Sequence, residues 1–407
     1  MTATAHAVSP VTISRFTTIG AICDQYGGSV QTGPFGSQLH ASDYTADGTP
    51  VVMPQDMAEG QILSNNIARV PDKHVTNLAR HQLKAGDIVF SRRGDVGRFA
   101  VVGEREKGWL CGTGSIRIRL NCPDIDTAYL RRFLQQDAIG AWLLHNAKGV
   151  TMPNLNTEII RAIPFAYPPL DEQRRIAAIL DQADDLRRKR RQALQNLQKV
   201  TRVVFLEMFG DPIANKRGWR IIPLGDAGTL DRGVSKHRPR NDPVLLGGPY
   251  PLIQTGDIAN CDGYVRAYDA TYSEEGLKQS KLWPAGTLCI TIAANIGKTG
   301  ILSFDACFPD SIVGFVPSSE VRTEFAQQWF VFVQPALEKD APQFAQKNIN
   351  LAILRALKLP IPSLDMQRAF AACVAEIDKL KAHHRAHLAQ LDALFASLQH
   401  RAFRGEL

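Results

Sequence analysis

The sequence predicts a mixed α/β (α+β) protein made of two copies of one unit, in which a long helix follows a globular domain. Two observations lead to this prediction. Short motifs recur in the same order in both halves of the chain, and each repeat ends in a long stretch with apolar residues at helical spacing. A chain of 407 residues is also too long for a single ordinary core.

The repeat is carried by short motifs rather than by overall identity. The offset between the copies is 194 residues near the end of each unit and 200 to 201 residues earlier in it. The loops of the two copies therefore differ in length by only a few residues. The later pairs are Asn154-Leu155-Asn156 with Asn348-Ile349-Asn350, Leu170-Asp171 with Leu364-Asp365, Gln173-Arg174 with Gln367-Arg368, and Phe209 with Phe403. The earlier pairs are Asp56 with Asp257, Ala85-Gly86 with Ala285-Gly286, and Gly97 with Gly297.

After each Leu-Asp pair the apolar residues follow steps of three and four, which predicts helices over residues 170–209 and 364–407. Pairing the two helices would bury both apolar stripes, and a pseudo-twofold relation between the units makes the predicted coiled coil antiparallel. Arg190 and His384 interrupt the stripes at the same place, which indicates that the helices face each other. The residues expected to pair the helices are Ile176, Leu180, Leu186, Leu194, Leu197, Phe370, Val374, Leu380, Leu388 and Leu391.

Each globular part is expected to combine strands and helices. In the first copy, strands are predicted at residues 88–90, 99–102 and 115–120, with a helix near Thr127 to Asn146. The second copy repeats this with a strand at 287–291 and a helix near Thr323 to Lys339. The predicted segments are an N-terminal tail (1–10), the first globular domain (11–169), a central helix (170–209), the second globular domain (210–363) and a distal helix (364–407).

Composition excludes several classes of protein. No apolar run reaches the roughly 18 residues that a membrane span needs, and residues 1–10 lack the regions of a signal peptide, so we expect a cytoplasmic protein without a membrane partner. The seven cysteines show no Cys-x-x-Cys spacing, which argues against a disulfide framework or a zinc finger. The net charge of +7 is spread along the chain, so any DNA contact would use local patches.

Several segments together resemble the specificity subunits of Type I restriction-modification enzymes. They are residues 33–52 (GPFGSQLHASDYTADGTPVV), 168–185 (PPLDEQRRIAAILDQADD), 248–258, 291–301, 348–367 and 400–407. The resemblance implies two target-recognition domains that each read one half of a bipartite double-stranded DNA target. It also implies that the helices set the unread gap and dock methyltransferase subunits, which would bind S-adenosylmethionine. Whether a restriction subunit is a further partner stays open.

The candidate DNA contacts lie mainly in two loops and two turns. The first loop offers donors and acceptors suited to base edges, and the second is strongly basic with only Asp231 and Asp242 nearby. The alternative for each residue is an ordinary solvated side chain. The loop candidates are Ser37, Gln38, His40, Lys236, His237, Arg238 and Arg240, the turn candidates are Arg92, Arg93 and Lys298, and the repeat adds Lys148, Thr151, Lys347 and Asn348.

The basic run at residues 187–191 leaves two interpretations open. It is either a nucleic-acid patch beside the DNA or a solvated helix face whose arginines pair with Asp181, Asp184 and Asp185.

No catalytic or metal-binding motif stands out, so we expect no catalytic residue, no metal and no cofactor on this chain. The chain lacks the Asn/Asp-Pro-Pro-Tyr/Phe motif of DNA amino-methyltransferases, and no lysine has an acid two residues before it, as metal-dependent nucleases require. The glycine-rich segment 295–300 has Ile292 where a phosphate-binding loop needs glycine. His383, His384, His387 and His400 lack a further ligand at suitable spacing. A DNA-modifying enzyme and a purely structural rod with two end domains are the alternative classes.

Overall fold

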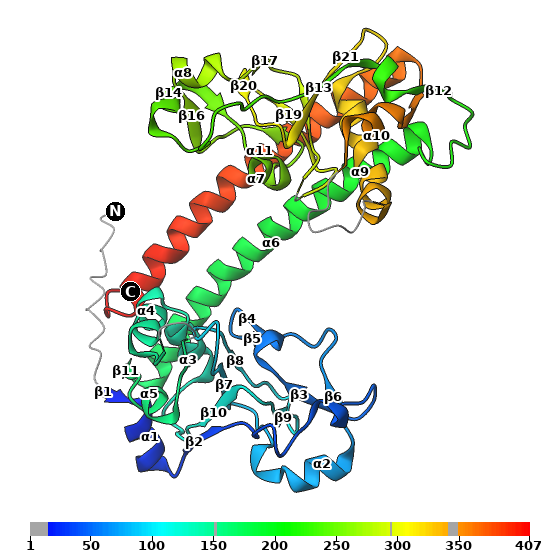
Figure 1. The fold of residues 1–407 in the computed structure, drawn as a ribbon. Helices are drawn as coiled ribbons and strands as arrows, with labels where there is room; N and C mark the ends of the chain where they lie inside the picture. Colours follow the sequence, from blue (N-terminus) through cyan, green and yellow to red (C-terminus); the bar gives the residue numbers. More distant parts are fainter. Residues whose placement is uncertain (1–14, 150–152, 294, 341–348) are drawn as a thin grey trace, which may run out of the picture. The chain divides into compact units, whose positions relative to one another are not determined.

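The computed structural model describes residues 15–149, 153–293, 295–340 and 349–407. They form two compact units, the first made of residues up to 189 together with 388–407, and the second of residues 190–387. Each unit contains one globular domain and part of both long helices, α6 (Leu170–Phe209) and α11 (Leu364–Ala402) (Figure 1). In the described part of the chain, no helix is both long enough and apolar enough to cross a membrane.

The first globular domain is built on an antiparallel sheet. Its strands follow the order β2 (Ser29–Thr32), β10 (Ser115–Arg119), β7 (Ile88–Ser91) and β8 (Phe99–Val101). A second sheet has the order β6 (Arg69–Val70), β3 (Thr49–Val52) and β9 (Leu110–Cys111), with β3 and β9 parallel. The remaining strands are β1 (Arg15–Thr18) paired with β11 (Pro164–Tyr167), and the hairpin β4 (Met57–Ala58) and β5 (Gln61–Ile62). The helices are α1 (Ile19–Tyr26), α2 (Asp72–Asn77), α3 (Thr127–Leu134), α4 (Asp137–Asn146) and α5 (Thr157–Arg161).

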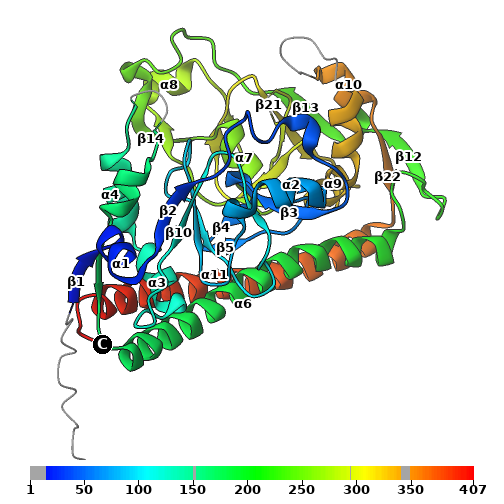
Figure 2. The same cartoon turned by 90° about the horizontal axis from the view of Figure 1, so that it is seen from below.

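The second globular domain repeats this topology. Its main sheet has the order β13 (Gly228–Arg232), β21 (Ile312–Pro317), β18 (Leu288–Thr291), β19 (Thr299–Leu302) and β15 (Tyr264–Val265). The second sheet has the order β16 (Ala270–Tyr272), β14 (Leu246–Leu252), β20 (Ala306–Cys307) and β17 (Leu282–Trp283), and β14 and β20 are again parallel. The strands β12 (Arg220–Pro223) and β22 (Lys358–Ile361) pair with each other (Figure 2). The helices are α7 (Thr255–Asn260), α8 (Glu274–Lys278), α9 (Thr323–Asp340) and α10 (Leu351–Ala356).

One predicted helix of the first domain is divided in the structure. The segment expected to be continuous from Thr127 to Asn146 is broken between α3 and α4, where Gln136 adopts an extended backbone and caps the second helix. The side chain of the preceding Gln135 donates to the carbonyl of Glu59 (2.7 Å), which fixes the chain at the break. The corresponding α9 of the second domain is continuous, as predicted.

The central helix α6 has the bounds that the apolar pattern predicts, whereas the distal helix α11 ends at Ala402 and not at residue 407. Gly405 has a positive φ of 74°, a conformation that ends a helix. This turn lets Phe403 pack beside Tyr129 and Phe133, with ring centroids 5.5 and 5.4 Å apart. The boundaries 11–169 and 210–363 of the two globular domains stay predictions.

The helices pair antiparallel within each unit, as predicted. In the first unit Arg187 of α6 donates to Asp392 of α11 (2.6 Å), and Arg175, nearer the start of α6, donates to the carbonyl of Leu407 (2.8 Å). In the second unit Arg190 donates to Nδ1 of His384 (3.1 Å). The two polar residues that interrupt the stripes at the same place are therefore in direct contact.

The residues predicted to pair the helices differ in burial. Leu186 and Leu380 are 45% and 52% exposed, so the prediction that they lie in the seam is wrong. The next residues along the helices, Arg187 and Lys381, take the inner positions: the Arg187 guanidinium lies 4.3 Å from the ring centroid of Phe395, and Lys381 is buried. Because successive helical residues differ by about 100° in direction, the neighbouring leucines face outward. Ile176, Leu180 and Phe370 are buried, and Leu194, Leu197, Val374, Leu388 and Leu391 are half-buried.

Each helix is anchored to a globular domain by a buried glutamine at the same place in the repeat. Gln173 accepts a hydrogen bond from the backbone N–H of Asp126 (2.9 Å) and donates to the carbonyls of Asp124 (2.8 Å) and Pro168 (2.9 Å). Gln367 accepts from the N–H of Arg322 (2.9 Å) and donates to the carbonyls of Glu320 and Pro362 (both 3.0 Å). Both side chains are fully buried, so the recurring Gln-Arg motif is a repeated structural anchor.

Replacing this anchor by an apolar residue of similar size is expected to destabilise the unit that contains it. Gln173→Leu removes three hydrogen bonds, and a buried backbone group left without a partner costs about 1–3 kcal/mol. We therefore expect the free energy of unfolding to fall by about 3 kcal/mol, measured by urea denaturation. The control is Gln192→Leu on the same helix, an exposed glutamine that contacts only Asn196, for which the change should stay within about 0.5 kcal/mol. Equal effects of the two variants would contradict the anchoring role.

Candidate nucleic-acid interface

One end of the main sheet in the first domain gathers most of the candidate contacts of that domain. Because β2, β10 and β7 are antiparallel neighbours, the end of β2, the start of β10 and the end of β7 meet there. The N–H of Gly33 donates to the carbonyl of Ser115 (2.8 Å), and the N–H of Arg92 donates to that of Gly114 (2.7 Å). We call this region, with Ser37, Gln38, His40, Arg92, Arg93 and Lys148, the first edge.

The loop at residues 33–40 is anchored by a buried side chain and has exposed polar side chains. Leu39 is buried and anchors the loop, while Ser37, Gln38 and His40 are exposed. Oε1 of Gln38 accepts from the N–H of Phe35 (3.2 Å), so its amide N–H groups remain available as donors. Phe35 itself is 57% exposed, an apolar surface beside these polar groups that the sequence analysis did not single out.

The basic residues of the first edge come from two segments that are joined by backbone pairing. Arg93 and Lys148 both form bridges with Asn154, and neither they nor Arg92 has a carboxylate partner among the described residues. Arg92 Nε, Thr113 Oγ1 and Asn154 Oδ1 are buried without a hydrogen-bond partner in the described part of the chain. Thr151 lies outside the described residues.

The second domain brings its candidates to the equivalent end of its main sheet. Arg232 at the end of β13 pairs with Val313, and Thr291 at the end of β18 pairs with Ile312, so the loop after β13 and the turn after β18 meet. The N–H groups of Lys236 and His237 both donate to Oε1 of Gln279 (2.7 and 3.1 Å), which shapes the loop. We call this region, with Lys236, His237, Arg238, Arg240 and Lys298, the second edge; the side chains of all five are exposed.

The main acidic partner of the basic loop was not apparent from the sequence. Asp310, just before β21, forms ion pairs with Arg240 (2.6 Å) and Arg238 (3.9 Å). Its position 70 residues beyond Arg240 explains why sequence proximity did not reveal it. The expectation that only Asp231 and Asp242 lie near the loop is therefore wrong. Asp310 orients the two guanidinium groups and reduces the net charge of the loop.

The two acids expected near this loop have different roles. Asp242 contacts Nε2 of His237 (3.1 Å) and accepts from the N–H of Val244 (3.1 Å). The Val244 N–H and then the His237 ring lower the pKa of Asp242 below its ordinary value, so it stays ionised at neutral pH. Asp231 forms ion pairs with Lys281 (3.8 Å) and Arg355 (3.5 Å).

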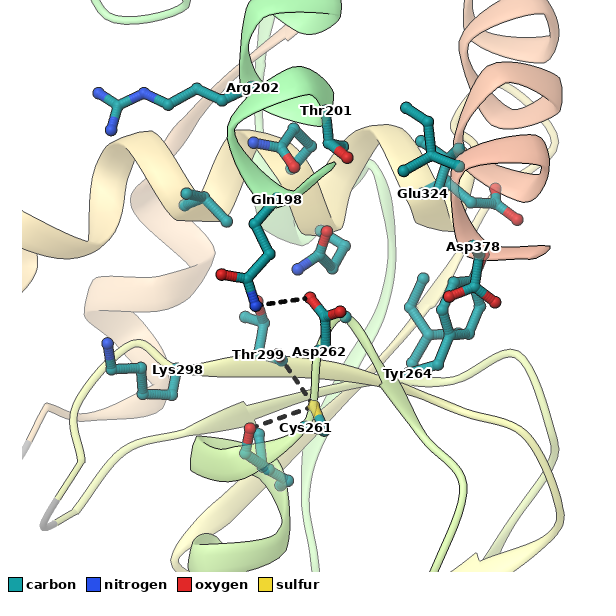
Figure 3. A pocket seen from close by; sticks show the side chains of 18 of the residues that line it. Gln198, Thr201, Arg202, Cys261, Asp262, Tyr264, Lys298, Thr299, Glu324 and Asp378 are labelled. Atoms are coloured by element: carbon teal, nitrogen blue, oxygen red, sulfur yellow. Dashed lines mark hydrogen bonds between the residues drawn. The ribbon is translucent and has the colours of Figure 1, made fainter. Parts of the chain in front are cut away.

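Lys298 lies in the turn between β18 and β19, and its backbone carbonyl accepts from the N–H of Thr291 (2.9 Å). Its side chain lines a cavity of about 450 Å³ in the second unit, and Figure 3 shows Lys298 and Arg202 on the same side of this cavity. Lys347 and Asn348 lie outside the described residues. The N–H of Ile349 donates to the carbonyl of Ile292 (3.0 Å), so Ile349 lies beside the turn after β18.

The interiors behind the two edges have different chemistry at an equivalent position. In the first domain the buried guanidinium of Arg117 on β10 donates to Gln31 Oε1 (2.9 Å) and Ser29 Oγ (3.1 Å). In the second domain Gly314 on β21 takes this place, and a Cβ there would come within 2.6 Å of the Trp283 ring. The same scaffold therefore supports two edges that differ in both surface and interior.

The basic run of α6 is largely engaged in contacts within the protein. Arg187 pairs with Asp184 (3.0 Å), Arg188 and Lys189 pair with Asp185, and Arg190 contacts His384. For these four residues the structure favours side-chain pairing over an open nucleic-acid patch.

The comparisons with known proteins all point to one family. The family model described as the Type I restriction modification DNA specificity domain matches residues 48–196 and 216–393. A Methanocaldococcus jannaschii protein, named as the type I restriction enzyme MjaX specificity subunit, is 22% identical over 353 residues, covering 82% of this chain and 81% of its own length. The Escherichia coli type I restriction enzyme EcoBI specificity subunit is 21% identical over 175 residues, which cover 42% of this chain and 37% of that protein.

Solved structures show the same fold. The S subunit of a Type I restriction-modification system from M. genitalium superposes with a TM-score of 0.54 at 16% identity, covering 99% of both chains. A chain from a structure concerned with assembly and conformational transition of the type I R-M system gives a TM-score of 0.56 at 19% identity, covering 97% of this chain and 98% of that one.

If the second edge binds DNA phosphates, removing one of its free cations should reduce the salt dependence of binding. For Lys236→Ala we expect the slope of log K against log salt concentration to fall by about 1, similarly for all DNA sequences. The measurement is a fluorescence titration of DNA with the assembled complex at several salt concentrations. The matched control is Lys358→Ala, an exposed lysine of the separate β12–β22 sheet, which should leave the slope unchanged. A slope that is unaltered in Lys236→Ala would remove this residue from the interface.

Proposed function

The chain belongs to the family of Type I restriction-modification DNA specificity subunits, and from this premise we propose that each globular domain reads one half of a bipartite double-stranded DNA target. The observation that carries the proposal is the pair of equivalent sheet edges. Each presents exposed donors and cations at the same end of a repeated sheet, yet their residues differ. Two different edges on one repeated scaffold suit two different half-sites.

The chemistry of each edge supports a division between base reading and phosphate binding. The first edge offers Ser37, Gln38 and His40, whose side chains can bond to base edges in the major groove. The second edge is richer in cations, and Arg238 and Arg240 are held in place by Asp310. Arginines oriented in this way are suited to guanine or to phosphate, because a planar guanidinium can donate two parallel hydrogen bonds.

The long helices, in this proposal, set the unread gap and dock the methyltransferase subunits. Their outer faces carry apolar residues that neither globular domain covers: Leu186, Val200, Val203, Leu380 and Leu394 are all at least 43% exposed. Leu186 and Leu380, and likewise Val200 and Leu394, are equivalent in the repeat, so the two units offer matching apolar positions. Equivalent surfaces of this kind would suit two copies of one partner.

We further propose that catalysis resides in the partner subunits and not in this chain. The chain carries none of the sequence motifs of a DNA methyltransferase or nuclease named above. The partner would bind S-adenosylmethionine and transfer the methyl group. The experiment is to incubate plasmid DNA and S-adenosylmethionine with the chain alone and with its methyltransferase subunit. Methylation should require both, and methylation by the chain alone would contradict the proposal and favour a DNA-modifying enzyme.

Exchange of one globular domain should change one half of the methylated sequence. When residues 11–169 are replaced by the matching segment of a relative, the half-site read by the first domain is expected to change while the other half and the gap persist. Methylome sequencing of cells that express each variant with the methyltransferase subunit measures both halves at once. Reciprocal exchange of residues 210–363 is the control. A change in both halves after either exchange would contradict independent reading, and no sequence preference at all would favour a purely structural role.

A further inference from the structure

Asp262 connects the second globular domain to both long helices. It lies in the short loop between α7 and β15, and it accepts hydrogen bonds from Gln198 of α6 (3.3 Å) and Lys381 of α11 (2.9 Å). Arg385 of α11 also donates to its carboxylate. Figure 3 shows the Asp262 side chain directed toward α6, with the bond to Gln198 drawn. One carboxylate of the domain therefore contacts two helices that are far apart in the sequence.

This contact is strong because one of its partners is a buried charge. The side chain of Lys381 is only 9% exposed, and Asp262 is its carboxylate partner within the described chain. A buried ammonium group without a partner is strongly destabilising, so Lys381 ties the position of the helix to the position of the loop. Gln198 also donates to Oδ1 of this carboxylate and Arg385 donates to Oδ2, so both oxygens are engaged and the orientation of the carboxylate is restricted.

A cavity of about 450 Å³ lies beside Asp262. Its walls include residues of α6, α7, α9 and α11 and of the turn between β18 and β19 (Figure 3). At a separate place, the domain packs tightly on the helices: the ring centroids of Phe325 and Phe332 on α9 lie 5.4 and 5.3 Å from that of Phe205 on α6. The aromatic cluster and the Gln367 anchor hold the domain at one place. Asp262, together with the neighbouring ion pair between Arg266 and Asp378 of α11, holds it at a second. Two points are needed to fix the angle of a domain on a helix pair.

In the first unit, the cation equivalent to Lys381 has a different carboxylate partner. Arg187 stands where Lys381 stands in the repeat, and its acid partner Asp392 stands where Gln198 stands. That acid belongs to the opposite helix, so the pair joins helix to helix. In the second unit the acid is supplied by the globular domain instead. The first unit also joins its network to its globular domain, because Arg132 pairs with Asp181 and Asp184 of α6 and Asp184 pairs in turn with Arg187. The first domain therefore supplies a cation to the network, whereas the second domain supplies the carboxylate of Asp262.

We propose that Asp262 is a positioning residue that fixes the angle of the second recognition domain on the helix pair and thereby restricts the complex to one unread gap length. The inference rests on the proposed function, in which the gap depends on how each recognition domain is held. It assigns Asp262 no contact with DNA. Its role is to hold the second edge at a constant place relative to the helices of its own unit.

The test compares Asp262→Ala with the double variant Asp262→Ala/Lys381→Met, each assembled with the methyltransferase subunit. Asp262→Ala leaves Lys381 buried and unpaired, so we expect both a lower unfolding temperature and a relaxed gap. Lys381→Met removes the unpaired charge and should restore the unfolding temperature. It cannot restore the attachment, so the gap should stay relaxed. We expect methylation at targets with a gap one base pair longer or shorter to rise about tenfold relative to the native gap, while both half-sites stay unchanged.

The matched control is Asp231→Asn, which removes ion pairs inside the second domain without touching either helix. It should keep the single gap. The inference is overturned if Asp262→Ala keeps the wild-type gap, or if the double variant recovers the gap together with the stability, since Asp262 would then be only structural.

Hydrogen exchange of the chain separates this inference from the proposed function. Loss of the attachment should raise the exchange of residues 255–265 in the double variant and leave β18 and β21 protected. Unchanged exchange at 255–265 would overturn the attachment even where bipartite methylation is observed. If exchange at 255–265 rises in the double variant but the wild-type complex methylates targets that are not bipartite, the attachment is upheld and the proposed function is refuted.

Discussion

Each globular domain depends on aromatic side chains that arrive at the end of a long helix. In the first unit the ring of Phe403, just beyond α11, packs against Tyr129 and Phe133 of α3. In the second unit Phe209, at the end of α6, packs against Phe325 of α9 and Phe370 of α11. Burying rings of this size is among the largest favourable contributions to folding. The ends of the helices are therefore part of the domain cores, and a helix cannot shift along its axis without opening a core.

Polar anchors set the register that the aromatic contacts require. Gln173 and Gln367 each make three hydrogen bonds to backbone groups, two as donor and one as acceptor. Asn156 and Asn350 cap the equivalent short helices α5 and α10. A buried amide satisfied in this way tolerates no displacement, because any shift leaves several polar groups without partners. The sequence repeat is thus largely a repeat of anchors, and the surfaces between the anchors are free to differ.

That freedom is visible at the two edges. Arg117 with its polar network lies behind the first edge, whereas Gly314 and Trp283 lie behind the second. Attachment differs as well: Arg131 and Arg132 of the first domain pair with Asp181 of α6, whereas Asp262 of the second domain receives cations from α11. A rigid repeated frame that carries divergent edges is what a reader of two unlike half-sites requires.

The sequence by itself determined the repeat, the bounds of α6, the antiparallel pairing and the facing of the helices, which the contact of Arg190 with His384 confirms. These follow from periodicity and from constant offsets, which survive because helical spacing and buried anchors constrain residue type along the chain. Only the tertiary structure decided which side chains face inward at the helix seam, where Arg187 and Lys381 replace Leu186 and Leu380. It alone also revealed Asp310 and Asp262. Their partners lie 70 and 119 residues away, and electrostatic attraction depends on distance in space, which local sequence patterns do not record.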